Sequence, residues 1–307
     1  MRKIFNKRLV ELAEHDERIH MVLADIGYGE IESFAEKFPN RYYNVGVAEQ
    51  NMTGVACGLA MEGNIAVTYS IANFPTLRCL EQVRNDVCYH NANVKIVIIG
   101  GGVSYGALGV SHHSTEDIAI MRALPNIVVV VPCDPKEAKY AVDAMIAHDG
   151  PVYYRCGYKN ESDVHDGEID FSFGKALTVR EGSDCTVIFC GPIGSEAKKA
   201  VEKLANEGLS CDLISMHTIK PIDKDAILGS VRKTGRLVTI EEHNLSGGLG
   251  SAVAEVLADG QLTGVKFKRM GFPDVYVHEV GSQAWLRTLY GLDSKGIEDT
   301  IKTLCSE

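Results

Sequence analysis

The chain has 307 residues, of which 45% are hydrophobic and 23% are charged, and its formal net charge is −10. This length accommodates two α/β domains, each with its own core, and the acidic balance argues against nucleic acid or an anionic membrane as a partner. No apolar run is long enough to span a bilayer and residues 1–6 lack the apolar core of a signal peptide, so we expect a cytoplasmic protein. Nine dispersed cysteines without a Cys-x-x-Cys pair are typical of reduced, buried thiols.

The first elements are a helix and a short strand. Apolar residues recur at helical spacing over 3–20, ahead of an apolar run at 21–24 that we expect to be a strand. The loop at 25–29 then carries two glycines. In open α/β sheets ligands collect at such strand ends, so this loop is a candidate binding element. A second short helix is expected over 31–37, before Pro39.

The most informative stretch is 41–60. It begins with aromatic and β-branched residues and then changes to helical spacing, so a strand is predicted to lead directly into a helix. Glu49 lies at the junction, and from the residues alone it is a first-turn carboxylate at the positive end of the helix macrodipole. Gly54 and Gly58 lie four residues apart, and their cost in helix propensity predicts close packing of this helix against another backbone.

The rest of the first half alternates strands and helices, which predicts a parallel sheet with helices on both faces. The loop at 100–114 holds five glycines and two adjacent histidines, and its length is unusual unless it is functional. Strands are expected over 65–70, 94–99, 127–131 and 152–154, and helices over 76–89, 115–124 and 135–147.

Residues 156–174 are polar and weakly periodic, which places a domain boundary there. We predict two doubly wound α/β domains, the first over 1–160 with a parallel sheet and the second, smaller one over 175–307, joined by a linker over 161–174. The second half repeats the alternation, with strands expected over 186–190, 211–215, 236–240 and 265–269 and helices over 195–207, 223–233 and 251–258.

The segment NVGVAEQNMTGVACGLA at 44–60 resembles the cofactor-activating segment of the transketolase family of thiamine-diphosphate enzymes, and the resemblance continues over nearly the whole chain. It implies that Glu49 is the acid that bonds N1′ of the aminopyrimidine and thereby assists removal of the C2 proton, after which the cofactor acts as an electron sink. Phe74 fits the aromatic residue that stacks on the aminopyrimidine, although an isolated Phe is more often a core residue. Ile71, Asp25 and Ile26 are the other expected cofactor contacts.

The segment GALGVSHHSTEDIAIMRALPN at 106–126 resembles the part of the family that carries the substrate-binding histidine. By position His112 takes this catalytic and substrate-binding role, with His113 as the open alternative. Arg155 matches a family arginine that grips a sugar phosphate, and Arg2 matches a second one, since a guanidinium meets phosphate oxygens in two parallel bonds. From the residues alone, a solvated terminal charge explains Arg2 equally well.

Three departures from the family pattern concern the substrate. Typical transketolases carry His at the position of Gly100, an acidic pair at Ala107 and Leu108, and Ser at Gly29. Because these family positions contact sugar hydroxyls, the resemblance implies retained cofactor chemistry with a non-standard, anionic sugar, such as a branched, deoxy or sulfonated one.

One family motif is absent. No Gly-Asp-Gly, which together with Asn holds Mg²⁺ and the diphosphate, occurs in this sequence. The resemblance therefore covers only the pyrimidine-binding and C-terminal parts of a transketolase, and we predict no metal site in this chain. A separate N-terminal subunit is expected to bind the diphosphate and Mg²⁺, with the cofactor between the two polypeptides and a dimer of heterodimers as the assembly. A glycine-rich loop at 247–250 could cradle an anion, as a weak motif.

Two other enzyme functions and one non-catalytic function stay open. A deoxyxylulose-phosphate synthase-like enzyme and a 2-oxoacid dehydrogenase β subunit share the acid and the domain order. An inactive scaffold or regulatory homologue would explain the departures at 29, 100 and 107–108, but it would have no need for Glu49 and Phe74.

Overall fold

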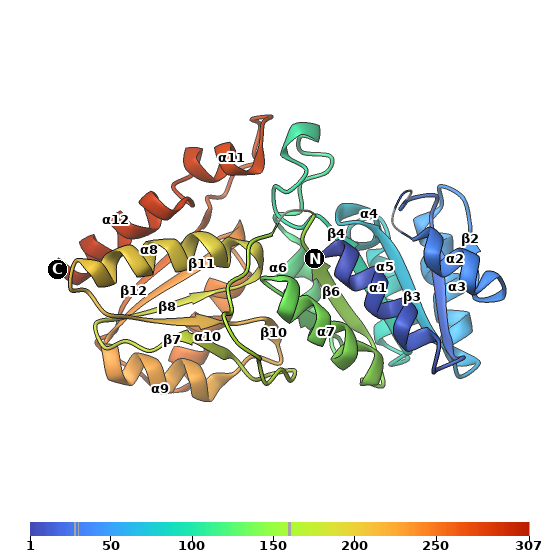
Figure 1. The fold of residues 1–307 in the computed structure, drawn as a ribbon, viewed down its shortest axis with the longest axis horizontal. Coiled ribbons are helices and arrows are strands. Elements are labelled where there is room, and N and C mark those ends of the chain that lie inside the picture. The colour runs from blue at the N-terminus through green and yellow to red at the C-terminus, as the bar shows by residue number, and fades with distance from the viewer. Residues whose placement is uncertain (28, 30, 159–160, 307) are drawn as a thin grey trace.

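The computed structural model describes residues 1–27, 29, 31–158 and 161–306. Two open sheets lie side by side, and each is covered by helices on both faces (Figure 1). This arrangement confirms the predicted α/β class with two domains. None of the helices in the described part of the chain combines the length and apolar character that crossing a bilayer requires. All nine cysteines are free, and eight of them are buried, as the sequence predicted.

The first sheet runs in the order β10-β5-β6-β4-β3-β1-β2. Its pairs are parallel except for β10, which is antiparallel to β5. Every residue of β4 is buried, as expected for a parallel strand covered on both faces. The strands are β1 (Ile19–Leu23), β2 (Tyr42–Asn44), β3 (Ile65–Ile71), β4 (Val94–Ile99), β5 (Val128–Val130), β6 (Val152–Cys156) and β10 (Thr218–Lys220).

Helices cover this sheet in two layers that follow from where their apolar residues point. One face packs against α1 (Arg2–Ala13), α2 (Glu32–Lys37) and α7 (Pro135–Ala147), whose buried residues form one core with that side of the strands. The opposite face carries α3 (Glu49–Met61), α4 (Asn73–Thr76), α5 (Leu80–Gln82), η2 (Val83–Cys88) and α6 (Asp117–Ala123). Short 3₁₀ turns complete this half at η1 (Pro39–Arg41) and η3 (Gly106–Leu108).

The second sheet runs in the order β12-β11-β8-β9-β7, with β7 antiparallel to β9 and the other pairs parallel. α8 (Gly194–Asn206) and α12 (Ser294–Ser306) cover one face, and α9 (Lys224–Thr234) and α10 (Leu249–Asp259) cover the other. The remaining elements are β7 (Leu177–Arg180), β8 (Cys185–Phe189), η4 (Gly191–Ile193), β9 (Cys211–Ser215), β11 (Arg236–Asn244), β12 (Lys266–Phe272) and α11 (Gln283–Leu289).

The two halves share one strand and one core. β10 comes from the second half of the chain but completes the first sheet on β5. The core beneath α3 and α6 continues to α9 and α10 of the second half. The predicted strand and helix alternation did not indicate this exchange, because three residues are too few to show a period.

Several predicted elements differ in detail. The helix expected over 3–20 ends at Ala13, because β1 already begins at Ile19. The helix expected over 76–89 is broken into α4, α5 and the π-helical η2. The predicted close packing at Gly54 and Gly58 is wrong within the described residues, since a Cβ added at either position would meet nothing within 4 Å.

Candidate active site

Glu49 begins α3, as the sequence predicted, but residues 45–48 separate it from the end of β2 at Asn44. Its side chain is only 3% exposed, and Arg78 Nη1 donates a hydrogen bond to Glu49 Oε2 at 2.8 Å. Arg78 itself is half exposed, so it forms the outer side of the pair. The result is a buried carboxylate at the positive end of a helix, compensated by a cation on its solvent side.

Three aromatic side chains continue from this ion pair. The guanidinium of Arg78 lies 4.6 Å from the centre of the Phe74 ring. The Phe74 ring meets His112 edge to face with centroids 5.5 Å apart, and His112 lies 6.0 Å from Tyr105. Glu49, Phe74 and His112, which come from three separate stretches of sequence, are thus joined through direct contacts.

A cavity of about 240 Å³ opens at the carboxyl ends of β1, β3 and β4. Its lining includes four of the residues predicted from the sequence: Arg2, Asp25, Ile26 and Ile71. Tyr105 also lines it, and therefore connects the cavity to the Phe74 and His112 cluster. This is the edge where ligands collect in open α/β sheets. Glu49, Phe74 and His112 do not line the cavity themselves and are linked to it through Arg78 and Tyr105.

Tyr105 was not predicted, and Gly100 explains its position. Gly100 has a φ of +79°, and a Cβ added there would lie 2.2 Å from the Tyr105 ring. Tyr105 therefore fills the space beside Gly100, where typical family members carry His. Burial, with Tyr158 nearby, raises the pKa of the Tyr105 phenol to about 12, so it stays protonated and can donate a hydrogen bond.

A second cavity, of about 490 Å³, lies between the loop around η3 and the segment that precedes α11. Tyr105, Ala107 and Leu108 line it on one side, and Gly281 to Gln283 line it on the other. Tyr105 thus forms a wall shared with the cavity at the sheet edge. The two positions at which family members carry acids present an apolar surface here.

The two histidines differ in environment. His112 is partly exposed and contacts the aromatic cluster, whereas His113 is 3% exposed. Burial lowers the pKa of His113. The geometry therefore favours His112 over His113 as the residue within reach of a ligand.

Arg155 does not fit its predicted role. The guanidinium donates to Asp117 through Nε at 2.7 Å and to the Ser114 and Glu242 carbonyl oxygens through Nη2 at 2.8 and 3.1 Å. It is 3% exposed and lies directly beneath Gly101. Because Nε and Nη2 are directed to protein partners of both domains, the geometry favours a role for Arg155 between the domains over the predicted grip on a substrate phosphate.

The glycine-rich loop at 247–250, a weak anion-binding motif in the sequence, surrounds an internal carboxylate. The backbone N–H groups of Leu249 and Gly250 donate to the Glu241 carboxylate at 2.6 and 2.8 Å. A Cβ at Gly248 would lie 2.0 Å from Glu241 Oε2. The glycine therefore admits an internal carboxylate to the start of α10, and these donors are not available to a phosphate.

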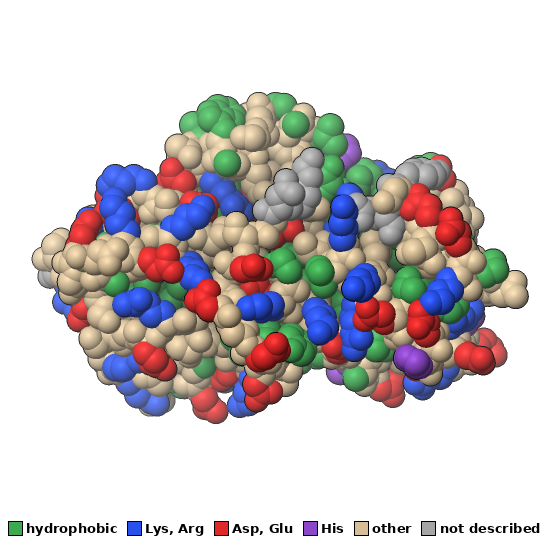
Figure 2. All heavy atoms as spheres, in the orientation of Figure 1, with side chains coloured by type: hydrophobic (Ala, Val, Ile, Leu, Met, Phe, Trp, Pro, Cys, Tyr) green, Lys and Arg blue, Asp and Glu red, His purple; other side chains and the backbone are tan. Residues whose placement is uncertain are grey.

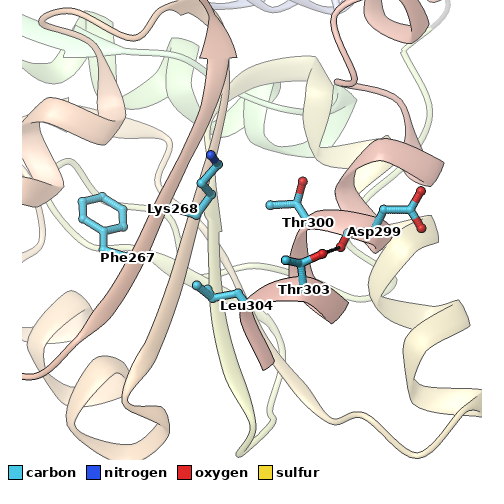
Figure 3. Close-up of a pocket in the computed structure, with 6 residues that line it drawn as sticks. All are labelled: Phe267, Lys268, Asp299, Thr300, Thr303 and Leu304. Carbon is cyan, nitrogen blue, oxygen red and sulfur yellow. Dashed lines mark hydrogen bonds between the residues drawn. The ribbon is translucent and has the colours of Figure 1, made fainter. Parts of the chain in front are cut away.

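Two other features lie apart from this surface. Cys133, Glu137 and His165 have ligand atoms within 4.8 Å of one another, but Glu137 Oε1 already pairs with His165 at 2.8 Å and accepts from Ser215 at 2.6 Å. These bonds give the cluster a structural role. A surface pocket between β12 and α12 is lined by none of the predicted residues (Figure 3).

A buried carboxyl, a nearby aromatic ring and a cavity at the sheet edge lie together here. These residues fit the aminopyrimidine end of thiamine diphosphate, because Glu49 would supply the acid and Phe74 the ring, and thiamine-diphosphate enzymes are the class that the sequence resembles. Family models agree with this class. "Transketolase, pyrimidine binding domain" matches residues 1–160, and "Transketolase, C-terminal domain" matches residues 174–297. The chain belongs to the transketolase family, and it corresponds to the C-terminal subunit of a split transketolase.

Relatives support this placement. The chain is 38% identical to a subunit of the apulose-4-phosphate transketolase of Phocaeicola vulgatus, over 96% of this chain and 94% of that one. It is also 38% identical to "6-deoxy-6-sulfo-D-fructose transketolase subunit SqwH" of Clostridium sp., over 97% and 92%. A solved structure described as "Split gene transketolase, inactive beta4 tetramer" matches with a TM-score of 0.89 and 35% identity, over 99% of this chain and 97% of that one.

Deoxyxylulose-phosphate synthases are similar over a shorter part of their length. The enzyme of Geobacter sulfurreducens is 37% identical over 96% of this chain but only 46% of its own. The chain thus spans about half of such a synthase and nearly the whole of a split transketolase subunit.

Proposed function

We propose that this chain supplies the aminopyrimidine half-site of a two-chain transketolase that transfers a two-carbon ketol unit from a ketose to an aldose. The observation that carries the proposal is the placement of Glu49, a buried carboxyl joined through Arg78 to Phe74 and through Phe74 to His112. A purely structural helix start has no need of a buried acid beside an aromatic cluster at a sheet edge.

Each site residue has a separate role in this proposal. When bound, thiamine diphosphate supplies a carbon that attacks the ketose carbonyl and an electron sink for the bond that breaks. Glu49 would hold a proton at N1′ of the aminopyrimidine, and Phe74 would stack on that ring. Ile71, Asp25 and Ile26 would line its surroundings. His112 would orient the substrate, and Arg2, which lines the sheet-edge cavity together with Tyr105, would be a cation for an anionic group.

Support for a partner subunit comes from exposed apolar side chains that flank the site. Val47 is 77% exposed beside Glu49, Leu77 is 48% exposed beside Arg78, and Val110 is 52% exposed near His112. Apolar surface of this kind is typical of protein interfaces. We propose that an N-terminal subunit covers it, brings Mg²⁺ and binds the diphosphate, and that two such pairs form a dimer of heterodimers in the cytoplasm.

The substrate proposal rests on Tyr105, Ala107 and Leu108. These residues put one phenol and two apolar side chains where family members have polar groups. A sugar that lacks hydroxyls on this side, such as a branched, deoxy or sulfonated one, would leave no polar group unpaired. One relative is named for 6-deoxy-6-sulfo-D-fructose, a deoxy and sulfonated sugar.

Reconstitution tests the proposal. The chain is combined with an N-terminal transketolase subunit that carries Gly-Asp-Gly, and thiamine diphosphate binding is measured by calorimetry with and without Mg²⁺. We expect binding only with both chains, and exchange of a ketol unit between a ketose and an aldose. Carbon dioxide release from pyruvate would favour the synthase or dehydrogenase alternative, and binding without any turnover would favour the scaffold.

A further inference from the structure

Among the described residues, Arg78 is the side chain that touches both residues assigned to the aminopyrimidine. Its Nη1 lies 2.8 Å from Glu49 Oε2, and its guanidinium carbon lies 4.6 Å from the centre of the Phe74 ring. Its side chain is 50% exposed, whereas that of Glu49 is 3% exposed. Arg78 therefore covers the solvent side of Glu49 while it packs on Phe74.

A ligand ring would need the same two contacts. A flat aminopyrimidine that hydrogen-bonds Glu49 and stacks on Phe74 approaches the carboxylate from its accessible side, and Arg78 lies on that side. Charge-assisted hydrogen bonds and cation–π contacts both favour the arginine position. Ring and guanidinium thus compete for one carboxylate and one aromatic face.

We propose that Arg78 is a latch on the aminopyrimidine half-site, which holds Glu49 and Phe74 in place until the cofactor ring displaces its guanidinium. This inference rests on the proposed function and deepens it. The latch compensates the charge of a buried carboxylate, and its displacement costs the cofactor part of its binding free energy.

The local fold allows this movement. Arg78 lies between α4, which ends at Thr76, and α5, which begins at Leu80, so its side chain can turn outward without opening a regular helix. Gln50 donates to the Arg78 carbonyl oxygen at 3.1 Å, which ties the backbone to α3. The backbone is therefore anchored while the half-exposed guanidinium can exchange its partners for water.

Thiamine diphosphate binding to the two-chain complex tests the latch. Arg78→Met keeps much of the apolar stem and removes the charge, and Arg78→Gln serves as a second variant if the first folds poorly. We expect the dissociation constant of thiamine diphosphate, measured by calorimetry, to fall about fivefold in these variants, in proportion to the removed competition. Arg84→Met, an exposed arginine of the same segment that bonds Asn85, is the matched control and should leave the constant unchanged.

A second comparison separates a latch from a structural ion pair. In a Glu49→Gln background the gain from Arg78→Met should shrink to about twofold or less, because the two residues are coupled. An unchanged or weakened affinity in the Arg78 variants overturns the latch while the proposed function stands. A wild-type complex that binds no thiamine diphosphate overturns both.

Discussion

Two arginine–carboxylate pairs in the first domain have nearly the same shortest distance but different surroundings. Arg78 meets Glu49 at 2.8 Å, and Arg155 meets Asp117 at 2.7 Å. The Arg155 side chain is 3% exposed and the Asp117 side chain 1%, whereas Arg78 is 50% exposed. Chemistry alone does not separate the pairs, but access to solvent does.

The difference indicates which pair serves a ligand. The Arg155 pair also binds carbonyl oxygens of Ser114 and Glu242, so it joins the first domain to the second. In the Glu49–Arg78 pair the carboxylate is buried and the guanidinium is exposed to solvent, next to exposed apolar residues. The buried pair is part of the domain interface, and the half-exposed pair can exchange its partner.

The largest effect is expected from breaking the buried Arg155–Asp117 pair. Arg155→Met leaves Asp117 as an uncompensated buried charge, so we expect the free energy of unfolding in urea to fall by about 3–5 kcal/mol. Arg180→Met, an exposed arginine of β7, should change it by less than about 0.5 kcal/mol. A stable Arg155 variant with a raised KM for a phosphorylated sugar would restore the substrate role that the sequence suggested.

A smaller effect on the free energy of unfolding is expected when the pH is lowered. Burial would raise the pKa of Asp117, but the Arg155 guanidinium outweighs burial and holds that pKa below its ordinary value. Because the unfolded carboxyl takes up a proton at higher pH, the contribution of Asp117 is complete above about pH 4 and is lost as the pH falls through the lower folded pKa. We expect the unfolding free energy of the wild type to fall as the pH is lowered below about 4, the ordinary pKa of the carboxyl.

Asp117→Asn should flatten this acid dependence, whereas Asp225→Asn, an exposed carboxylate of α9, should leave it unchanged. Denaturant titrations at each pH measure the slope. If Asp117→Asn and the wild type lose stability in parallel, the Arg155–Asp117 pair does not carry the acid sensitivity assigned to it.

The smallest effect is expected at His112, in the partly exposed cluster beside Phe74 and Arg78. His112→Ala should raise the KM for the ketose about tenfold, the equivalent of about 1.4 kcal/mol, with little change in stability. His113→Ala should instead lower the unfolding free energy, because its side chain is buried. Steady-state kinetics and thermal melts of both variants make the comparison, and a reversed pattern would assign the substrate contact to His113.

The sequence predicted much of this fold, and it predicted most of the residues from which the candidate site is built. The change of period at 41–60 correctly gave a strand leading into a helix with Glu49 at the junction. A strand end predicted the loop of Asp25 and Ile26 as a binding element, and the family resemblance supplied Ile71, which lines the same cavity. Local patterns sufficed here because these features depend on residues close together in the chain.

Features that depend on long-range contacts were missed. Arg155 has a family match, but its partners Asp117 and Glu242 are 38 and 87 residues away, so no local pattern shows its burial. The position of Tyr105 follows from the space beside Gly100, which only the folded structure shows. The exposed apolar lobe formed by α11 and the loop around η3 is likewise a property of the assembled surface, as Figure 2 shows. Arg78 carried no motif, although its spacing of four residues from Phe74 was a usable signal.

The central claim is that the Glu49 carboxyl activates the cofactor, and hydrogen–deuterium exchange at C2 of thiamine diphosphate in the two-chain complex tests it most directly. Glu49→Gln keeps the shape of the side chain and removes the acid, so we expect exchange to slow by about 100-fold or more with the fold intact. Glu62→Gln, at the other end of α3, should exchange at the wild-type rate. Wild-type exchange in the Glu49→Gln complex would contradict the account.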